Sequence, residues 1–139
     1  MVRQRVAVIF GGRSGEHEVS IVSARSVMQA LDPNRWEVVP FGVTRSGAWL
    51  TPEQTLQSLA AGHTAFRGGG ASLLSSTAAL DALAGCDVAF PLVHGTYGAD
   101  GTMQGFLEMA NLPYAGCGVA ASAIGMDKAL MKALFREAG

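Results

Sequence analysis

Charge is scarce in this sequence, and no stretch of it is strongly basic. Only 15% of the 139 residues are Asp, Glu, Lys or Arg, and the formal net charge is −1. Without a cluster of Lys and Arg, nucleic-acid binding and attraction to a membrane surface have no electrostatic support. No apolar run reaches the length that a membrane-spanning helix needs. We therefore expect a cytoplasmic protein that binds neither nucleic acid nor membrane.

Cysteine is also scarce, and two common nucleotide-binding motifs are absent. The two cysteines, Cys86 and Cys117, lack metal-ligand spacing and indicate no disulfide framework, so we expect no metal site. Neither G-x-G-x-x-G nor G-x-x-x-x-G-K-[ST] occurs in the chain. A dinucleotide site built on the common fingerprint and a P-loop are therefore both excluded.

An apolar, β-branched run near the N-terminus is the clearest signal of fold. Val6–Phe10 has the composition of a strand buried on both faces, as in a parallel sheet. Gly11 and Gly12 end this strand, and apolar residues recur at helical spacing from Val19. Strand, glycine turn and helix open a doubly wound α/β domain, in which ligands bind at the carboxyl ends of the strands. The length suits one such domain.

Similar patterns predict the remaining elements. Proline at position 91 predicts the end of regular pairing in its strand, because proline lacks the amide that a central strand needs. We expect strands over 36–43 and 87–93, with short ones at 48–50, 72–74 and 113–115. We expect helices from Val19 to Leu31 and over 52–59, 77–84, 101–110 and 119–137.

The first glycine turn carries a group of polar residues to the mouth of the predicted sheet. Two interpretations of this group are open. In the first, Ser14 caps the helix, and Glu16 and Glu18 lie favourably against its positive end. In the second, Glu16 is held over the strand ends and receives the ammonium group of a small amino-acid substrate. His17 belongs to the same run.

Two later segments repeat the order of buried strand, glycines, polar groups and helix. His94 follows the strand over 87–93, and Asp100 is the expected N-cap of the helix over 101–110. The third turn is Gly116-Cys117-Gly118. A parallel sheet would bring all three turns to one edge, which predicts a site there. Taken alone, His94 also fits a turn residue with local hydrogen bonds, and Lys128 fits a solvated helix position.

Three blocks of the sequence, each at a predicted strand-to-helix turn, resemble the N-terminal part of the D-alanine–D-alanine ligase family, whose members are ATP-grasp ligases. The resemblance extends from Val6 to Gly139. The matching blocks are Gly11–Ser20, His94-Gly95 with Gly98 and Asp100-Gly101-Thr102, and a third that includes Gln104-Gly105, Leu112-Pro113-Tyr114 and Met126-Asp127-Lys128.

The resemblance implies a fold and a reaction. The fold is Rossmann-like (pre-ATP-grasp), with a mostly parallel sheet flanked by helices in three layers. Members of the family use ATP and Mg²⁺ to phosphorylate the carboxylate of one D-alanine. The amino group of a second D-alanine then attacks the acyl phosphate, and the dipeptide enters peptidoglycan. The family is usually homodimeric, so a homodimer is implied here.

The resemblance also implies roles for particular residues. Glu16 matches the glutamate that holds the ammonium of the first D-alanine, and His94 matches a histidine near the reacting carboxyl group. Ser14 and Val19 lie in the wall of the same pocket. Lys128 matches a lysine that reaches toward the ATP phosphates. A carboxylate suits an ammonium, and a lysine suits phosphate as a mobile point charge.

The sequence departs from the family pattern in two ways. Ala99 stands where an acidic residue usually precedes the Asp-Gly pair, so we expect His94 either to be less tightly held or to use Glu18 or Asp100 instead. Family members also continue into a central domain and a C-terminal ATP-grasp domain, which bind adenine and magnesium. We interpret residues 1–139 as the single N-terminal substrate-binding domain of such a ligase, a truncated or proteolysed piece that is inactive alone.

Three alternatives remain open from the sequence. The first is a relative that joins D-alanine to D-lactate or D-serine. The second is a free-standing module that binds a small ligand and does no chemistry, which a stop codon after Gly139 would favour. The third is the matching domain of another ATP-grasp enzyme, against which the Glu16–Ser20 run argues.

Overall fold

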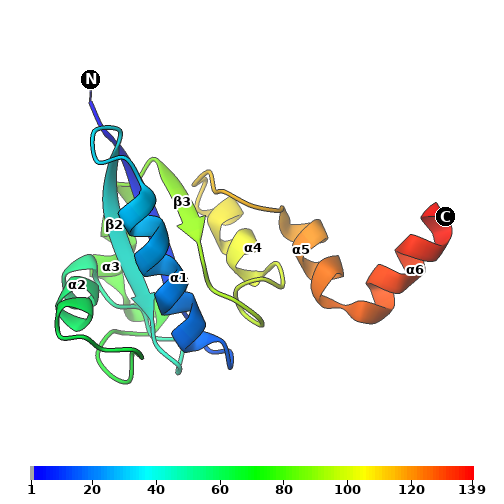
Figure 1. Cartoon of the computed structure of the whole chain (residues 1–139), viewed down its shortest axis with the longest axis horizontal. Coiled ribbons are helices and arrows are strands. Elements are labelled where there is room, and N and C mark those ends of the chain that lie inside the picture. The colour runs from blue at the N-terminus through cyan, green and yellow to red at the C-terminus, as the bar shows by residue number, and fades with distance from the viewer. Residues whose placement is uncertain (1) are drawn as a thin grey trace.

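The computed structural model describes residues 2–139 and contains one parallel sheet with strand order β2-β1-β3. The elements in chain order are β1 (Gln4–Gly11), α1 (His17–Ala30), β2 (Trp36–Val43), α2 (Pro52–Ala60), the 3₁₀ turn η1 (Leu73–Ser75), α3 (Thr77–Ala84), β3 (Val88–Pro91), α4 (Thr102–Met109), α5 (Val119–Met126) and α6 (Lys128–Ala138). Figure 1 shows α1 lying along one face of the sheet.

Alternation along the strands divides the core between the two faces of the sheet. Val6, Val8 and Phe10 of β1 pack toward α1, in the cluster that includes Ile21 and Ala24. The intervening residues of β1 belong to a second cluster, which the residues of α3 and α4 complete. Helices therefore cover both faces of a parallel sheet, and the predicted three-layer α/β class is confirmed.

The two long strands predicted after β1, over 36–43 and 87–93, are both present in the structure as β2 and β3. β2 has the predicted bounds, and β3 ends its register at Pro91, opposite Ile9. The short strands predicted at 48–50 and 113–115 are isolated bridges, through Trp49 and Tyr114. The strand predicted at 72–74 is wrong, because the chain forms η1 there and its bridge to Trp49 lies at Ala71.

A capping box fixes the start of α2. The Thr51 side chain accepts a hydrogen bond from the Gln54 N–H, and the Gln54 side chain accepts one from the Thr51 N–H. One turn later, Thr55 is fully buried; its hydroxyl accepts from the Gly42 N–H at 2.9 Å and donates to the Thr51 carbonyl at 2.8 Å. The bond from Gly42 ties the helix to the carboxyl end of β2.

The long helix predicted over 119–137 is wrong, because Asp127 breaks it into α5 and α6. The backbone of Asp127 is extended, with φ −96° and ψ 103°, and its side chain accepts from the N–H groups of Ala129 and Leu130. An aspartate that caps a helix in this way satisfies donors that have no partner within the helix. Figure 1 shows α5 and α6 extending away from the sheet. Leu134 and Phe135 of α6 are accordingly 50% and 66% exposed.

Gly11, at the carboxyl end of β1, has the tightest surroundings of the first turn. Its φ is +95°, and a Cβ there would lie 2.3 Å from the Val43 carbonyl oxygen. Gly15 in the same turn has no atom within 4 Å of an added Cβ.

We expect Gly11→Ala to lower the free energy of unfolding by about 3 kcal/mol, through backbone strain and overlap. Gly15→Ala should change it by less than about 0.5 kcal/mol. Urea unfolding of both variants checks this, and equal losses would contradict it.

Candidate functional site

The turns after β1 and β3 are joined by a buried serine. The Ser14 hydroxyl donates to the His94 carbonyl at 2.7 Å and accepts from the Glu16 N–H at 3.2 Å. The same residue thus fixes both the backbone in front of α1 and the backbone after β3. The predicted helix cap at Ser14 is wrong in detail, because the N-cap position is Glu16 and no side chain caps it.

A second serine makes a parallel link one turn into α1. The Ser20 hydroxyl accepts from the Gly11 N–H at 2.8 Å and donates to the Leu92 carbonyl at 2.6 Å. Ser20 is fully buried. A hydroxyl that both donates and accepts satisfies two backbone groups at the point where the strands end. The first two predicted turns are therefore held together at one edge of the sheet.

Glu16 lies at this junction with its carboxylate facing the turn after β3. The residue is exposed, and its Oε2 is 3.4 Å from the position that a Cβ on Gly95 would occupy. The salt bridges found among residues 2–139 are Arg5–Glu37 and Glu18–Arg45, so Glu16 takes no part in one. An exposed carboxylate without a cationic partner can receive an ammonium group.

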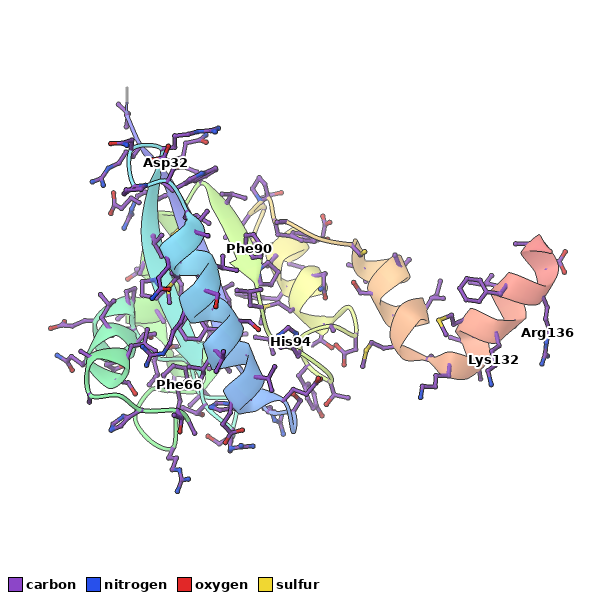
Figure 2. All side chains as sticks on the ribbon, in the orientation of Figure 1. Asp32, Phe66, Phe90, His94, Lys132 and Arg136 are labelled. Atoms are coloured by element: carbon purple, nitrogen blue, oxygen red, sulfur yellow. The ribbon has the colours of Figure 1, made fainter. Side chains whose placement is uncertain are left out.

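Val19 and His94 lie on the two segments that meet near this carboxylate. Val19 is in the first turn of α1, three residues after the N-cap Glu16, and is 57% exposed. His94 is half-buried where the chain leaves β3. Figure 2 shows His94 beside the first turns of α1, with Phe66 on the other side. The structure therefore joins Ser14 to the backbone of Glu16 and of His94, and Val19 lies in the first turn of α1.

The acidic residues expected to orient His94 are engaged elsewhere. Glu18 pairs with Arg45, and the hydrogen bond from that arginine holds the pKa of the Glu18 carboxyl below its usual value. Asp100 accepts from the N–H groups of Tyr97 at 2.9 Å and Thr102 at 3.1 Å. Of the two alternatives, the one in which Glu18 or Asp100 orients His94 is wrong for the described residues. The histidine is instead held through its backbone by Ser14.

Asp100 does not occupy the N-cap position predicted for it, which Gly101 takes with a φ of +95°. Its carboxylate still binds the start of α4 through Thr102 and closes the turn through Tyr97. Partial burial acts to raise the pKa of Asp100, but these hydrogen bonds outweigh it and leave the pKa below its usual value. The carboxylate form therefore stabilises this turn.

Lys128 is not part of the cluster. It is the first residue of α6 and lies on an exposed surface formed with Ala129, Lys132 and Arg136 of the same helix. Figures 1 and 2 show α6, with Lys132 and Arg136, well away from the sheet. The resemblance alone assigned Lys128 to the ATP phosphates, and the structure places this residue beyond the break at Asp127.

His17 is the residue of this region to which sequence reasoning gave no role. It is fully buried, and both of its ring nitrogens have backbone partners, Gly12 and Phe66. The buried residues of α1 are His17, Ser20, Ile21 and Ala24. The signal that could have found it is this i, i+3, i+4, i+7 spacing, which places His17 on the core face.

Two cavities lie near the site without containing its carboxylate. The larger, about 680 Å³, is lined by α2 and by the loop over 62–69, including His63 and Phe66. The smaller, about 200 Å³, lies at the strand ends between Gly12, Val43 and Val93. The Arg13 guanidinium borders it and stacks 4.3 Å from the centre of the Tyr97 ring.

Residues 2–139 contain neither a cluster of metal ligands nor a helix suited to cross a membrane. Within this range no three His, Cys, Asp or Glu side chains gather as a metal ion would require. In the same part of the chain, none of the helices combines the length and apolar character that crossing a membrane demands.

Turns joined at the carboxyl edge of a parallel sheet define an α/β domain of the class in which ligands bind at that edge. The family model for the D-ala D-ala ligase N-terminus matches residues 5–117. The chain therefore belongs to the D-alanine–D-alanine ligase N-terminal family, and the resemblance noted in the sequence is confirmed.

Individual relatives agree with this assignment. The D-alanine–D-alanine ligases of Rhodococcus opacus and Mycolicibacterium vanbaalenii are 49% and 47% identical, over 99% of this chain and 42% of their own length. The chain spans about two fifths of the curated relatives that it matches.

Solved structures show the same relation. A D-alanine–D-alanine ligase from Coxiella burnetii matches with a TM-score of 0.75 and 32% identity, over 99% of this chain and 42% of that one. The VanG D-Ala:D-Ser ligase from Enterococcus faecalis matches with a TM-score of 0.74 and 30% identity, over 99% of this chain and 43% of that one.

We expect Asp100→Asn to lower the free energy of unfolding by about 1 kcal/mol at neutral pH, because the carboxylate hydrogen bonds are lost. A lowered pKa gives stability that is complete above the ordinary carboxyl value of about 3.9 and is lost as the pH falls through the folded value. The difference from wild type should therefore shrink below pH 4.

Urea unfolding between pH 7 and pH 2 measures this difference. The exposed Asp81 on α3 provides the control, since Asp81→Asn should change little at either pH. A difference for Asp100→Asn that stays constant down to pH 2 would show that the ionised carboxylate is not responsible.

Proposed function

We propose that this chain forms the N-terminal substrate-binding domain of an ATP-dependent D-alanine–D-alanine ligase. In this proposal the full enzyme joins two D-alanine molecules through an acyl phosphate, and the dipeptide serves peptidoglycan synthesis. The domain assignment for residues 1–139 draws support from relatives that carry this ligase name and are more than twice as long as the chain.

One observation carries the proposal. Glu16 presents a carboxylate without a cationic partner directly opposite Gly95, next to His94, at the edge where two buried strands end. Ser14 links the two turns that carry these residues. This arrangement can hold a small zwitterion with its ammonium on the glutamate and its carboxyl group toward the histidine.

Each side chain then has a defined task. Glu16 binds the ammonium of the first D-alanine by a charge-assisted hydrogen bond, and the exposed Val19 borders the same pocket. His94 lies near the carboxyl group and can donate a hydrogen bond to it as negative charge accumulates. Ser14 keeps both turns in register, so the distance between the glutamate and the histidine is fixed.

Lys128 belongs to the proposal as the residue that would contact the phosphates of ATP. It lies on one face of α6 with Lys132 and Arg136, and three cations at this spacing suit a polyphosphate. The carboxylates that would hold Mg²⁺ are not grouped among residues 2–139, so ATP and Mg²⁺ would be bound mainly by other parts of the enzyme. ATP supplies the phosphoryl group that activates the carboxylate.

The setting that we propose is a homodimeric enzyme of the cytoplasm. The second substrate is D-alanine in the main proposal. The similarity to a D-Ala:D-Ser ligase supports D-serine as the second candidate, because this domain has the same fold in enzymes of either name.

The test is ADP release from ATP, magnesium and D-alanine by the full chain that the gene encodes, compared with residues 1–139 alone. We expect activity in the longer chain only. Glu16→Gln should reduce kcat/KM by about 100-fold, because the ammonium loses its charged partner. Glu18→Gln is the matched control, since Glu18 pairs with the exposed Arg45 and should cost less than about threefold.

Other outcomes identify the alternatives. Faster turnover when D-serine or D-lactate is added with D-alanine would assign the enzyme to those relatives. An open reading frame that stops at Gly139, with no ADP release but saturable binding of D-alanine, would favour the non-catalytic binding module. Equal effects of the Glu16 and Glu18 substitutions would remove Glu16 from the substrate site.

A further inference from the structure

The side chain of His17 is in one defined chemical state. Its Nδ1 lies 2.7 Å from the Gly12 carbonyl oxygen, and the Phe66 N–H donates to Nε2 at 2.9 Å. A carbonyl oxygen can only accept and a backbone amide can only donate. Nδ1 therefore carries the ring proton and Nε2 offers a lone pair, which defines a neutral ring with one tautomer.

The ring is also packed on all sides. A Cβ on Gly11 would lie 3.1 Å from the His17 Cε1 atom, so only a glycine leaves room for the ring there. Phe66 meets the ring edge-on, with centroids 5.7 Å apart at 83°, and Phe66 in turn packs against Phe10 at 5.6 Å. His17 has no exposed surface and Phe66 has 2%. Such a ring cannot rotate without displacing its neighbours.

The position of His17 in the chain connects it to the substrate pocket. Glu16 is the N-cap of α1 and directly precedes the buried His17, so the ring anchors the backbone next to the exposed glutamate. Its bond to the Gly12 carbonyl closes the turn over 12–17, within which Ser14 and Glu16 lie. The ring therefore holds the backbone that carries Glu16 from the core side, while the Glu16 carboxylate lies near Gly95.

The other bond reaches a distant loop. Phe66 is 49 residues further along the chain and lies in the segment between α2 and η1. This segment forms a wall of the cavity of about 680 Å³. The first turn of α1 is thus supported by the loop over 62–69. Among the hydrogen bonds of residues 2–139, none joins this loop directly to Ser14, Glu16 or His94.

We propose that His17 is a positioning residue for Glu16, and that the loop around Phe66 is the support through which it acts. This inference rests on the proposed function, because it concerns how Glu16 meets the ammonium of D-alanine. Loss of either hydrogen bond would let the turn over 12–17 shift. Glu16 would then be misplaced, and a misplaced binding group weakens the binding of substrate.

The kinetic test uses the full chain that the gene encodes. His17→Phe keeps a ring but leaves the Gly12 carbonyl and the Phe66 amide unpaired. We expect it to raise the KM for D-alanine about tenfold, with the KM for ATP changed less than twofold. His17→Gln retains one donor and one acceptor and should recover most of the loss.

Thr55→Val is the matched control for stability. Thr55 is also fully buried and also bridges two backbone groups, but it ties α2 to β2 and not the turn of Glu16. This variant should lose stability and keep its KM for D-alanine within twofold. An equal rise in KM for Thr55→Val and His17→Phe would overturn the positioning role.

A second measurement is independent of activity. Nitrogen NMR of the His17 ring should show protonated Nδ1 and unprotonated Nε2 at neutral pH. A proton on Nε2 would overturn the inference, because the Phe66 amide could not then donate to it.

Glu16→Gln in the same kinetic assay separates the two proposals. If Glu16→Gln has no effect, the proposed function fails; if only His17→Phe has none, the inference alone fails.

Discussion

The hydrogen bonds from Ser14 and Ser20 to the carbonyls that follow β3 are the interactions on which the site depends. β1 is the middle strand, so its carboxyl end has a neighbour on either side. The register of β3 ends at Pro91, and the last backbone bond to β1 runs from the Leu92 N–H to the Ile9 carbonyl at 2.7 Å. Beyond it, two serine hydroxyls bind the carbonyls of Leu92 and His94. The site exists where side-chain hydrogen bonds take over from backbone pairing.

Glycine has a complementary part in the same place. Side chains cannot be accommodated at Gly11, beside the Val43 carbonyl, or at Gly98, where an added Cβ would lie 2.4 Å from the Val93 carbonyl. The close approach of backbone that these residues permit leaves the polar side chains to face one another. Serine hydroxyls and glycine backbone together set the geometry of this edge of the sheet.

Local signals in the sequence predicted most of the fold. Thr51-Pro52 predicted the start of α2, the apolar run at 6–10 predicted β1, and Pro91 predicted where β3 stops. These features depend on a few adjacent residues and on burial, which a sequence pattern records. The α/β class and the meeting of the first two turns followed from the same logic.

The failures involve contacts between distant residues or a choice between equal local patterns. Asp127 lies in a run that reads as one helix, and its capping of α6 could not be separated from an ordinary helical aspartate. His17 meets Phe66 across 49 residues, which no periodicity reports. The partner of Glu18 is Arg45 in another turn, so Glu18 was wrongly considered for His94.

The break at Asp127 has a mechanical consequence. The Asp127 carboxylate accepts hydrogen bonds from the N–H groups of Ala129 and Leu130, which begin α6. The Asp127 N–H donates to the carbonyls of Ala123 and Ile124 in α5. Each helix keeps its own hydrogen bonds, so the direction of α6 relative to α5 is set by the backbone angles of this one residue. The basic face of α6, with Lys128, Lys132 and Arg136, therefore takes its orientation from a single extended aspartate.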